Sequence, residues 1–209
     1  MPRNENREYR SMPIMRAEQN PEAEKSYKVR GYASTFDEAY PLYEDYDGNP
    51  VYEVIDRHAF DGCDMTDVIM QFDHTGMVYA RTRNGSLAVS TDDHGLLIEA
   101  DLGLTQESRK LYEAIATGLI DRMSFCFTEL DDPSWDSENR TFRVTRIGKL
   151  YDVSAVSIPA NPGTDIAAAR KQRMDGVIQA ERAERLAQAQ RQKRIRILQV
   201  RLRVIQARG

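Results

Sequence analysis

Three side chains in this 209-residue sequence, one histidine, one serine and one aspartate, have the types needed for nucleophilic catalysis. His74 follows an apolar strand-like run, Ser124 lies in the run Met-Ser-Phe-Cys-Phe-Thr, and Asp152 interrupts a second apolar run. A serine hydroxyl becomes a good nucleophile when an imidazole takes its proton, and a carboxylate behind the imidazole stabilises the resulting imidazolium. Their order along the chain, His then Ser then Asp, matches none of the three best-known triad orders. The residue types therefore suggest a triad, which spacing alone does not establish.

His74 has a simpler structural interpretation that the residues leave open. Side chains alternate along a strand, so Val68, Met70, Phe72 and His74 are expected on one face. That places an imidazole at the mouth of an apolar face. A histidine there can serve as a base, or can simply bond a backbone carbonyl at the edge of the core.

Ser124 and Asp152 have simpler interpretations too. Ser124 shares a strand face with Cys126 and Thr128, opposite large apolar side chains, and this small polar face suits either the floor of a cleft or the solvent side of the strand. Asp152 shares a face with Leu150, and an unpaired carboxylate on a buried face costs several kcal/mol. Either a partner such as a histidine orients toward it, or an edge strand or bulge turns it outward.

The elements that would hold these residues are mostly strands. Alternating and β-branched residues predict strands at 10–16, 27–36, 51–55, 68–72, 86–91, 96–102, 122–130 and 140–158. The turn from Asp92 to Gly95 predicts a hairpin with Gly95 at positive φ, and residues 37–50 predict a long exposed loop. The pattern indicates a mostly antiparallel α+β domain, either a barrel or a sandwich.

One internal helix is expected between Thr105 as N-cap and Gly118 as the stop, with Leu111, Ile115 and Leu119 at helical spacing. Residues 58–60 resemble a single helical turn, and the prolines of 159–162 are expected to end the compact body.

The last 44 residues differ in composition, because Ala, Arg and Gln dominate them. Residues 167–198 have high helix propensity. Beyond them the pattern is ambiguous: Ile195, Leu198, Leu202 and Ile205 have coiled-coil spacing, yet 200–204 alternates as a strand does.

Charge also divides the chain. Residues 166–209 hold 12 Lys and Arg against 3 Asp and Glu, a net of +9, whereas the remaining residues hold 17 against 30, a net of −13. A protein that recognises nucleic acid normally carries basic charge on its folded part as well, and this sequence does not. We therefore expect two different parts, an acidic body and a basic helical tail.

Composition argues against several other classes of protein. No run approaches the roughly 18 apolar residues of a membrane span, and the polar N-terminus lacks the apolar core of a secretory signal. Two cysteines, Cys63 and Cys126, do not supply a disulfide framework, and the three histidines have no metal-ligand spacing. We expect a soluble intracellular protein with no cofactor and no metal.

Several sequence blocks point to a known family. The longest are Val29-Arg30-Gly31-Tyr32-Ala33-Ser34-Thr35-Phe36-Asp37, Phe72-Asp73-His74, Met123-Ser124-Phe125 and Leu150-Tyr151-Asp152-Val153-Ser154-Ala155-Val156, with shorter blocks at 53–55, 59–60, 86–87, 95–96, 118–120 and 159–162. In these blocks the sequence resembles the prohead (capsid maturation) serine proteases of tailed bacteriophages. The blocks follow the family's order over roughly residues 10 to 165.

The family is similar to the herpesvirus assemblins, and this implies an α+β fold with a mostly antiparallel, β-barrel-like core and one or two packed helices. It implies a protease domain at 1–165, with Ser124 as nucleophile and His74 as general base. The long C-terminal helical tail at 166–209 lies outside the resemblance; its composition predicts it, and we expect it to serve in targeting or scaffolding. Many relatives carry Glu where this chain has Asp152, which accepts the same hydrogen bond and is expected to be the orienting acid. His58 and His94 lie outside the matching blocks and are expected to be structural or exposed.

The leading hypothesis is a serine endopeptidase that cleaves capsid and scaffold polypeptides inside the assembling procapsid in the host cytoplasm, with self-cleavage in the tail. Two alternatives are a Cys126 nucleophile on the same face as Ser124 and a non-enzymatic capsid-assembly scaffold that retains the fold. The expected partners are the major capsid protein and scaffold, with self-association and weak, non-specific nucleic-acid contact by the tail as further options.

Overall fold

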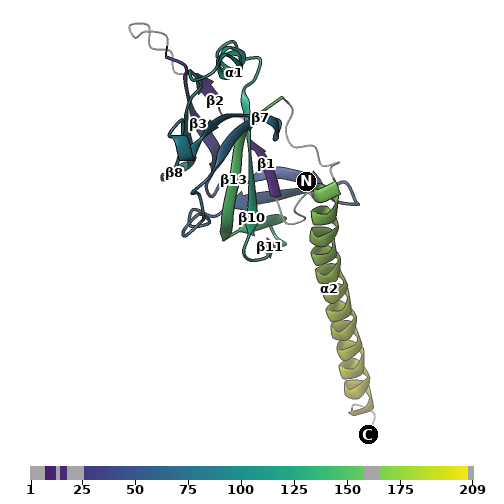
Figure 1. Cartoon of the computed structure of the whole chain (residues 1–209). Helices are drawn as coiled ribbons and strands as arrows, with labels where there is room; N and C mark the ends of the chain where they lie inside the picture. The colour runs from purple at the N-terminus through teal and green to yellow at the C-terminus, as the bar shows by residue number, and fades with distance from the viewer. Residues whose placement is uncertain (1–7, 13–14, 18–25, 158–164, 207–209) are drawn as a thin grey trace. The chain divides into compact units, whose positions relative to one another are not determined.

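The computed structural model describes residues 8–12, 15–17, 26–157 and 165–206. The chain divides into two compact units, Met1–Ala168 and Ala169–Gly209. The described strands lie in the first unit and form three sheets, and two α-helices accompany them along the chain (Figure 1). The α+β class and the long C-terminal helix are thus confirmed. The described strands close no barrel, so the barrel-like core stays a prediction, as does the domain boundary after residue 165.

The sheet that carries the candidate triad has five strands. Their spatial order is β1 (Glu8–Met12), β10 (Arg122–Glu129), β13 (Ile147–Val156), β6 (Ile69–Phe72) and β7 (Thr75–Arg81). All neighbours are antiparallel except β13 and β6, which are parallel. β13 is therefore a central strand, with β10 on one side and β6 on the other.

The other two sheets have four strands each. One has the order β2 (Met15–Ala17), β3 (Lys28–Thr35), β9 (Gly95–Asp101) and β8 (Leu87–Thr91); the other has β11 (Ser134–Asp136), β12 (Thr141–Val144), β5 (Pro50–Ile55) and β4 (Tyr40–Glu44). Strand β4 lies where a long loop was predicted, and 140–158 forms two strands instead of one. The predicted hairpin β8–β9 is confirmed, but Gly95 is required for a different reason: a Cβ there would lie 2.0 Å from the Ser34 carbonyl oxygen.

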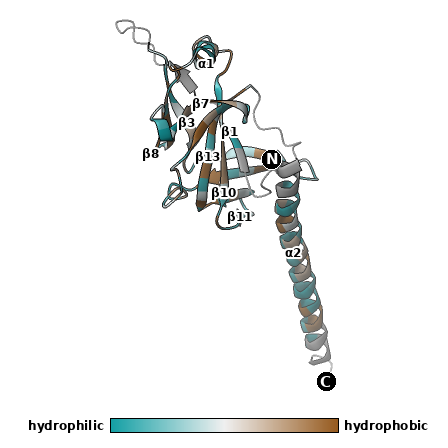
Figure 2. Ribbon diagram, in the orientation of Figure 1, coloured by the Kyte–Doolittle hydropathy of each residue, from teal (hydrophilic) through white to brown (hydrophobic). Residues whose placement is uncertain are grey.

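One core of buried side chains joins all three sheets and the internal helix. Met123, Phe125 and Phe127 point into it from β10, so their predicted common face is confirmed. In Figure 2 the hydrophobic colour is concentrated on strands of the first unit. This core holds β10 in place, and the opposite face of β10 carries Ser124.

Helix α1 (Gln106–Ala116) begins where the sequence predicts, because the Thr105 side chain accepts a hydrogen bond from the Ser108 N–H. Leu111 and Ile115 are buried, but Leu119 lies beyond the helix and is 81% exposed. A short 3-10 helix, Thr82–Asn84, precedes β8. Residues 58–60 form hydrogen-bonded turns and no helix.

Helix α2 (Asp165–Gln206) is continuous for 42 residues, so the strand alternative at 200–204 is wrong. Hydrophilic colour dominates along it in Figure 2. The prolines of 159–162 lie outside the described residues.

Candidate active site

The imidazole of His74 bonds both other members of the predicted triad. Its Nδ1 lies 2.6 Å from Oδ1 of Asp152, and its Nε2 lies 2.6 Å from Oγ of Ser124. An ionised carboxylate can only accept, so Nδ1 carries the hydrogen and Nε2 accepts the Ser124 hydroxyl proton. The three side chains, spread over 78 positions of sequence, thus form one continuous chain of hydrogen bonds.

Pairing of β10 with β13 brings the serine and the aspartate together. Ser124 lies opposite Ser154, and Cys126 lies opposite Asp152. Ser124 is fully buried and Asp152 is 5% exposed, so neither the solvent-side interpretation of Ser124 nor an outward-turned Asp152 holds. The side chain of His74 keeps 15% of its surface exposed, and solvent reaches the group from the imidazole side.

His74 is positioned by a tight turn, and the predicted alternation from Val68 is wrong for this residue. β6 ends at Phe72, which pairs with Thr75 of β7, and the two residues between them have φ of 49° (Asp73) and 55° (His74). Two positive φ values in a two-residue hairpin loop are the signature of a type I′ turn. The direction of the His74 imidazole is therefore set by the turn and not by the alternation of side chains along β6.

Asp152 has a second hydrogen-bond donor, which sequence analysis missed. The Ser154 hydroxyl lies 2.7 Å from the same Oδ1 that faces His74. A buried carboxylate needs such donors because it has lost its hydration. The available signal was local: Ser154 lies two positions from Asp152, on the same face of a strand.

The remaining histidines lie elsewhere, as expected. His58 is exposed and its Nδ1 lies 3.0 Å from a carboxylate oxygen of Asp61. His94 is exposed in the β8–β9 turn, with its ring edge-on to Tyr32.

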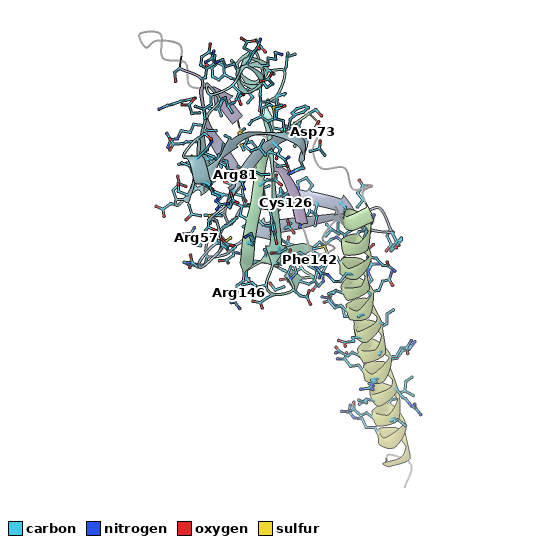
Figure 3. All side chains as sticks on the ribbon, in the orientation of Figure 1. Arg57, Asp73, Arg81, Cys126, Phe142 and Arg146 are labelled. Carbon is cyan, nitrogen blue, oxygen red and sulfur yellow. The ribbon has the colours of Figure 1, made fainter. Side chains whose placement is uncertain are left out.

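The alternative of a Cys126 nucleophile has less support from the geometry, because the Nε2 of His74 bonds the Ser124 hydroxyl and not a thiol. Cys126 is buried on β10 (Figure 3). Burial raises the pKa of the Cys63 thiol to about 11, which keeps it protonated at neutral pH.

No group of three or more His, Cys, Asp or Glu side chains suited to a metal ion occurs among the described residues. Within the same residues, no helix is both long enough and apolar enough to span a membrane.

The chain was compared with models of known protein families. The model for the caudovirus prohead serine protease matches residues 13–179. The chain belongs to this family. The match contains all three residues of the hydrogen-bonded chain, begins after β1 and extends into α2. No curated protein and no solved structure matches the chain.

Membership in the prohead protease family makes the chain a serine protease with a role in capsid maturation. It implies capsid proteins as substrates and action within the assembling procapsid in the host cell.

Proposed function

We propose that this prohead protease is an endopeptidase that cleaves capsid and scaffold polypeptides, with Ser124 as nucleophile, His74 as general base and Asp152 as orienting acid. The observation that carries the proposal is the continuous hydrogen-bonded chain, with 2.6 Å on each side of the imidazole. Both separations are within the reach that proton transfer requires.

The proposed reaction follows from the donors and acceptors. His74 Nε2 takes the hydroxyl proton as Ser124 Oγ attacks the scissile carbonyl carbon, and Asp152 stabilises the imidazolium. The imidazolium then protonates the leaving amine as the C–N bond breaks, which leaves an acyl-enzyme on Ser124. Water, deprotonated by His74, then attacks the ester carbonyl carbon. The imidazolium returns this proton to Ser124 Oγ as the ester C–O bond breaks, which releases the second product and the free serine.

Co-expression with the major capsid protein of the same phage tests the proposal. Ser124→Ala removes the attacking oxygen, and we expect capsid processing to fall at least 1,000-fold, to background. Ser90→Ala, at an exposed serine of β8, is the matched control and should process normally. Intact-mass spectrometry of both chains identifies the cut sites. Normal processing by Ser124→Ala would contradict the assignment of the nucleophile.

Capsid cleavage also distinguishes Ser124 from Cys126 as the nucleophile. Alkylation of the purified protein by iodoacetamide should leave capsid cleavage unchanged, because His74 activates the serine. Loss of cleavage that parallels alkylation of Cys126 would favour the thiol instead.

We also propose that α2 retains the enzyme within the procapsid by binding capsid or scaffold protein, and that part of 166–209 is removed by self-cleavage. Support comes from apolar side chains that are exposed on a basic helix: Ile195 and Leu198 are 54% and 56% exposed, close to Arg194 and Arg196. Such a surface fits a partner helix with apolar and acidic residues. A full-length mass that never shortens within proheads would contradict self-cleavage.

A further inference from the structure

The turn that holds His74 has an unfavourable backbone conformation for its residues. Asp73 and His74 both have positive φ, where side chains other than glycine are disfavoured, although Asp and His tolerate the region better than most. Residues held in such conformations persist when surrounding contacts over-determine them. Asp73 supplies three such contacts here.

Asp73 ties the turn to the end of β13 through three hydrogen bonds. Its backbone N–H donates to the Ala155 carbonyl at 2.9 Å. Its Oδ1 accepts the Ser157 N–H at 2.8 Å, and its Oδ2 accepts the Ser157 hydroxyl at 2.8 Å. Both carboxylate oxygens are thus bonded to Ser157, and we call the two side-chain contacts the Asp73–Ser157 clasp. Asp73 is labelled in Figure 3.

The clasp joins the two elements whose relative position decides the geometry of the triad. Ser157 follows β13, the strand that carries Asp152, and Asp73 is adjacent to His74 in the chain. Pairing of β6 with β13 itself is sparse, at Asp152 with Ile69 and Ala155 with Phe72. The last of these pairs, Ala155 with Phe72, precedes the turn, so the clasp adds a restraint on the turn that strand pairing does not provide.

We infer that Asp73 is a positioning residue for catalysis: through Ser157 it holds the imidazole of His74 within reach of both Asp152 and Ser124. This inference rests on the proposed triad. Displacing a catalytic group by about 1 Å can cost on the order of 100-fold in rate. Loss of the clasp should thus slow attack by Ser124 without weakening substrate binding.

Two substitutions at position 73 separate the clasp from the backbone of the turn. Asp73→Gly keeps the preference for positive φ but removes both side-chain acceptors. Asp73→Asn tolerates positive φ, keeps an oxygen for the Ser157 N–H and offers an amide to the Ser157 hydroxyl. Ser157→Ala removes only the hydroxyl bond, and leaves the turn sequence unchanged.

The experiment measures the reaction of Ser124 in the full-length chain with a fluorophosphonate, which resolves the maximal inactivation rate, kinact, from the half-saturating concentration, KI. For Asp73→Gly we expect kinact to fall about 10- to 100-fold with KI unchanged. Asp73→Asn should stay within about threefold of wild type, and Ser157→Ala should fall between the two. Asp92→Gly is the matched control, since Asp92 bonds two backbone N–H groups of the β8–β9 turn away from the triad.

Each outcome decides one point. Wild-type kinact in Asp73→Gly, or an equal loss in Asp92→Gly, would overturn the positioning role. An increase in KI alone would also overturn it. If Asp73→Gly does not fold, the kinact of Ser157→Ala decides, with wild-type behaviour counting against the clasp. Failure of the wild-type protein to label at Ser124 would instead overturn the proposed function.

Discussion

At the scale of single residues, the buried polar groups of the proposed triad satisfy one another's hydrogen bonds. Asp152 is buried and accepts from both His74 and Ser154 at the same oxygen. A hydrogen bond to a charged group contributes about 1.5–3 kcal/mol, more than a neutral one. Ser154 thus helps keep Asp152 oriented toward the imidazole, although it has no role in the bond-breaking steps.

Ser154→Ala tests this role. Removing the hydroxyl leaves one donor fewer on Asp152, and we expect the rate of fluorophosphonate labelling at Ser124 to fall about 10-fold, the equivalent of about 1.4 kcal/mol. Ser90→Ala again serves as the control. Labelling at the wild-type rate would show that His74 alone is sufficient to orient the carboxylate.

At the scale of elements, β1 lies at the edge of the sheet beside β10, the strand of Ser124, and is anchored through a buried ion pair. Arg10 of β1 bonds Glu53 of β5 through both Nε and Nη2, and the Tyr40 hydroxyl donates to the same carboxylate. Burial, together with the charge of Glu53, raises the pKa of Tyr40 well above its ordinary value, so it remains a donor. The guanidinium also lies 5.4 Å from the ring centre of Phe127 on β10.

Arg10→Ala should destabilise the protein strongly. Glu53 is fully buried, so losing the guanidinium removes two charge-assisted hydrogen bonds from a buried carboxylate and lowers the free energy of unfolding by about 3 kcal/mol. The matched control is Arg30→Ala, whose partner Glu99 is 55% exposed; that change should cost under about 0.5 kcal/mol. Chemical denaturation measures both, and equal losses would contradict a special role for the buried pair.

At the scale of the whole molecule, the net charge differs between the part of the chain that holds the proposed triad and the tail that we propose retains the enzyme in the procapsid. The basic charge of the chain is concentrated in 166–209, whereas the triad lies in an acidic part of the sequence. The proposed retention by the tail rests on this difference, because a partner surface with acidic residues attracts the basic tail and repels the acidic body. Changes in the tail should therefore reduce the amount of enzyme retained in proheads without reducing its proteolytic activity.

Neutralising the tail tests that separation. Replacing Arg191, Lys193 and Arg194 by Gln should lower the amount of enzyme recovered in purified proheads about fivefold, while labelling of Ser124 stays unchanged. As the control, Gln at Arg57, Arg83 and Arg146, exposed arginines of the sheet-bearing unit, should leave recovery unchanged. Equal losses in both variants would indicate a general charge effect and contradict a specific role of the tail.

The features of this protein that depend on neighbouring residues could be predicted from the sequence alone. Strand alternation separated Ser124 from the core-facing Phe125, helix signals located Thr105 as an N-cap, and the charge division marked the tail. These features follow from side-chain periodicity and capping chemistry, which act over a few residues.

The contacts between these segments could not be predicted from the sequence, because they depend on the packing of distant strands. The type I′ turn directs His74, the β10–β13 register brings Ser154 opposite Ser124, and Arg10 reaches Glu53 across 43 positions. Register and sheet order depend on which faces are buried against which partners, a property of the whole core. The sequence therefore named the three residues of the proposed triad, and the packing of distant strands decided that they touch.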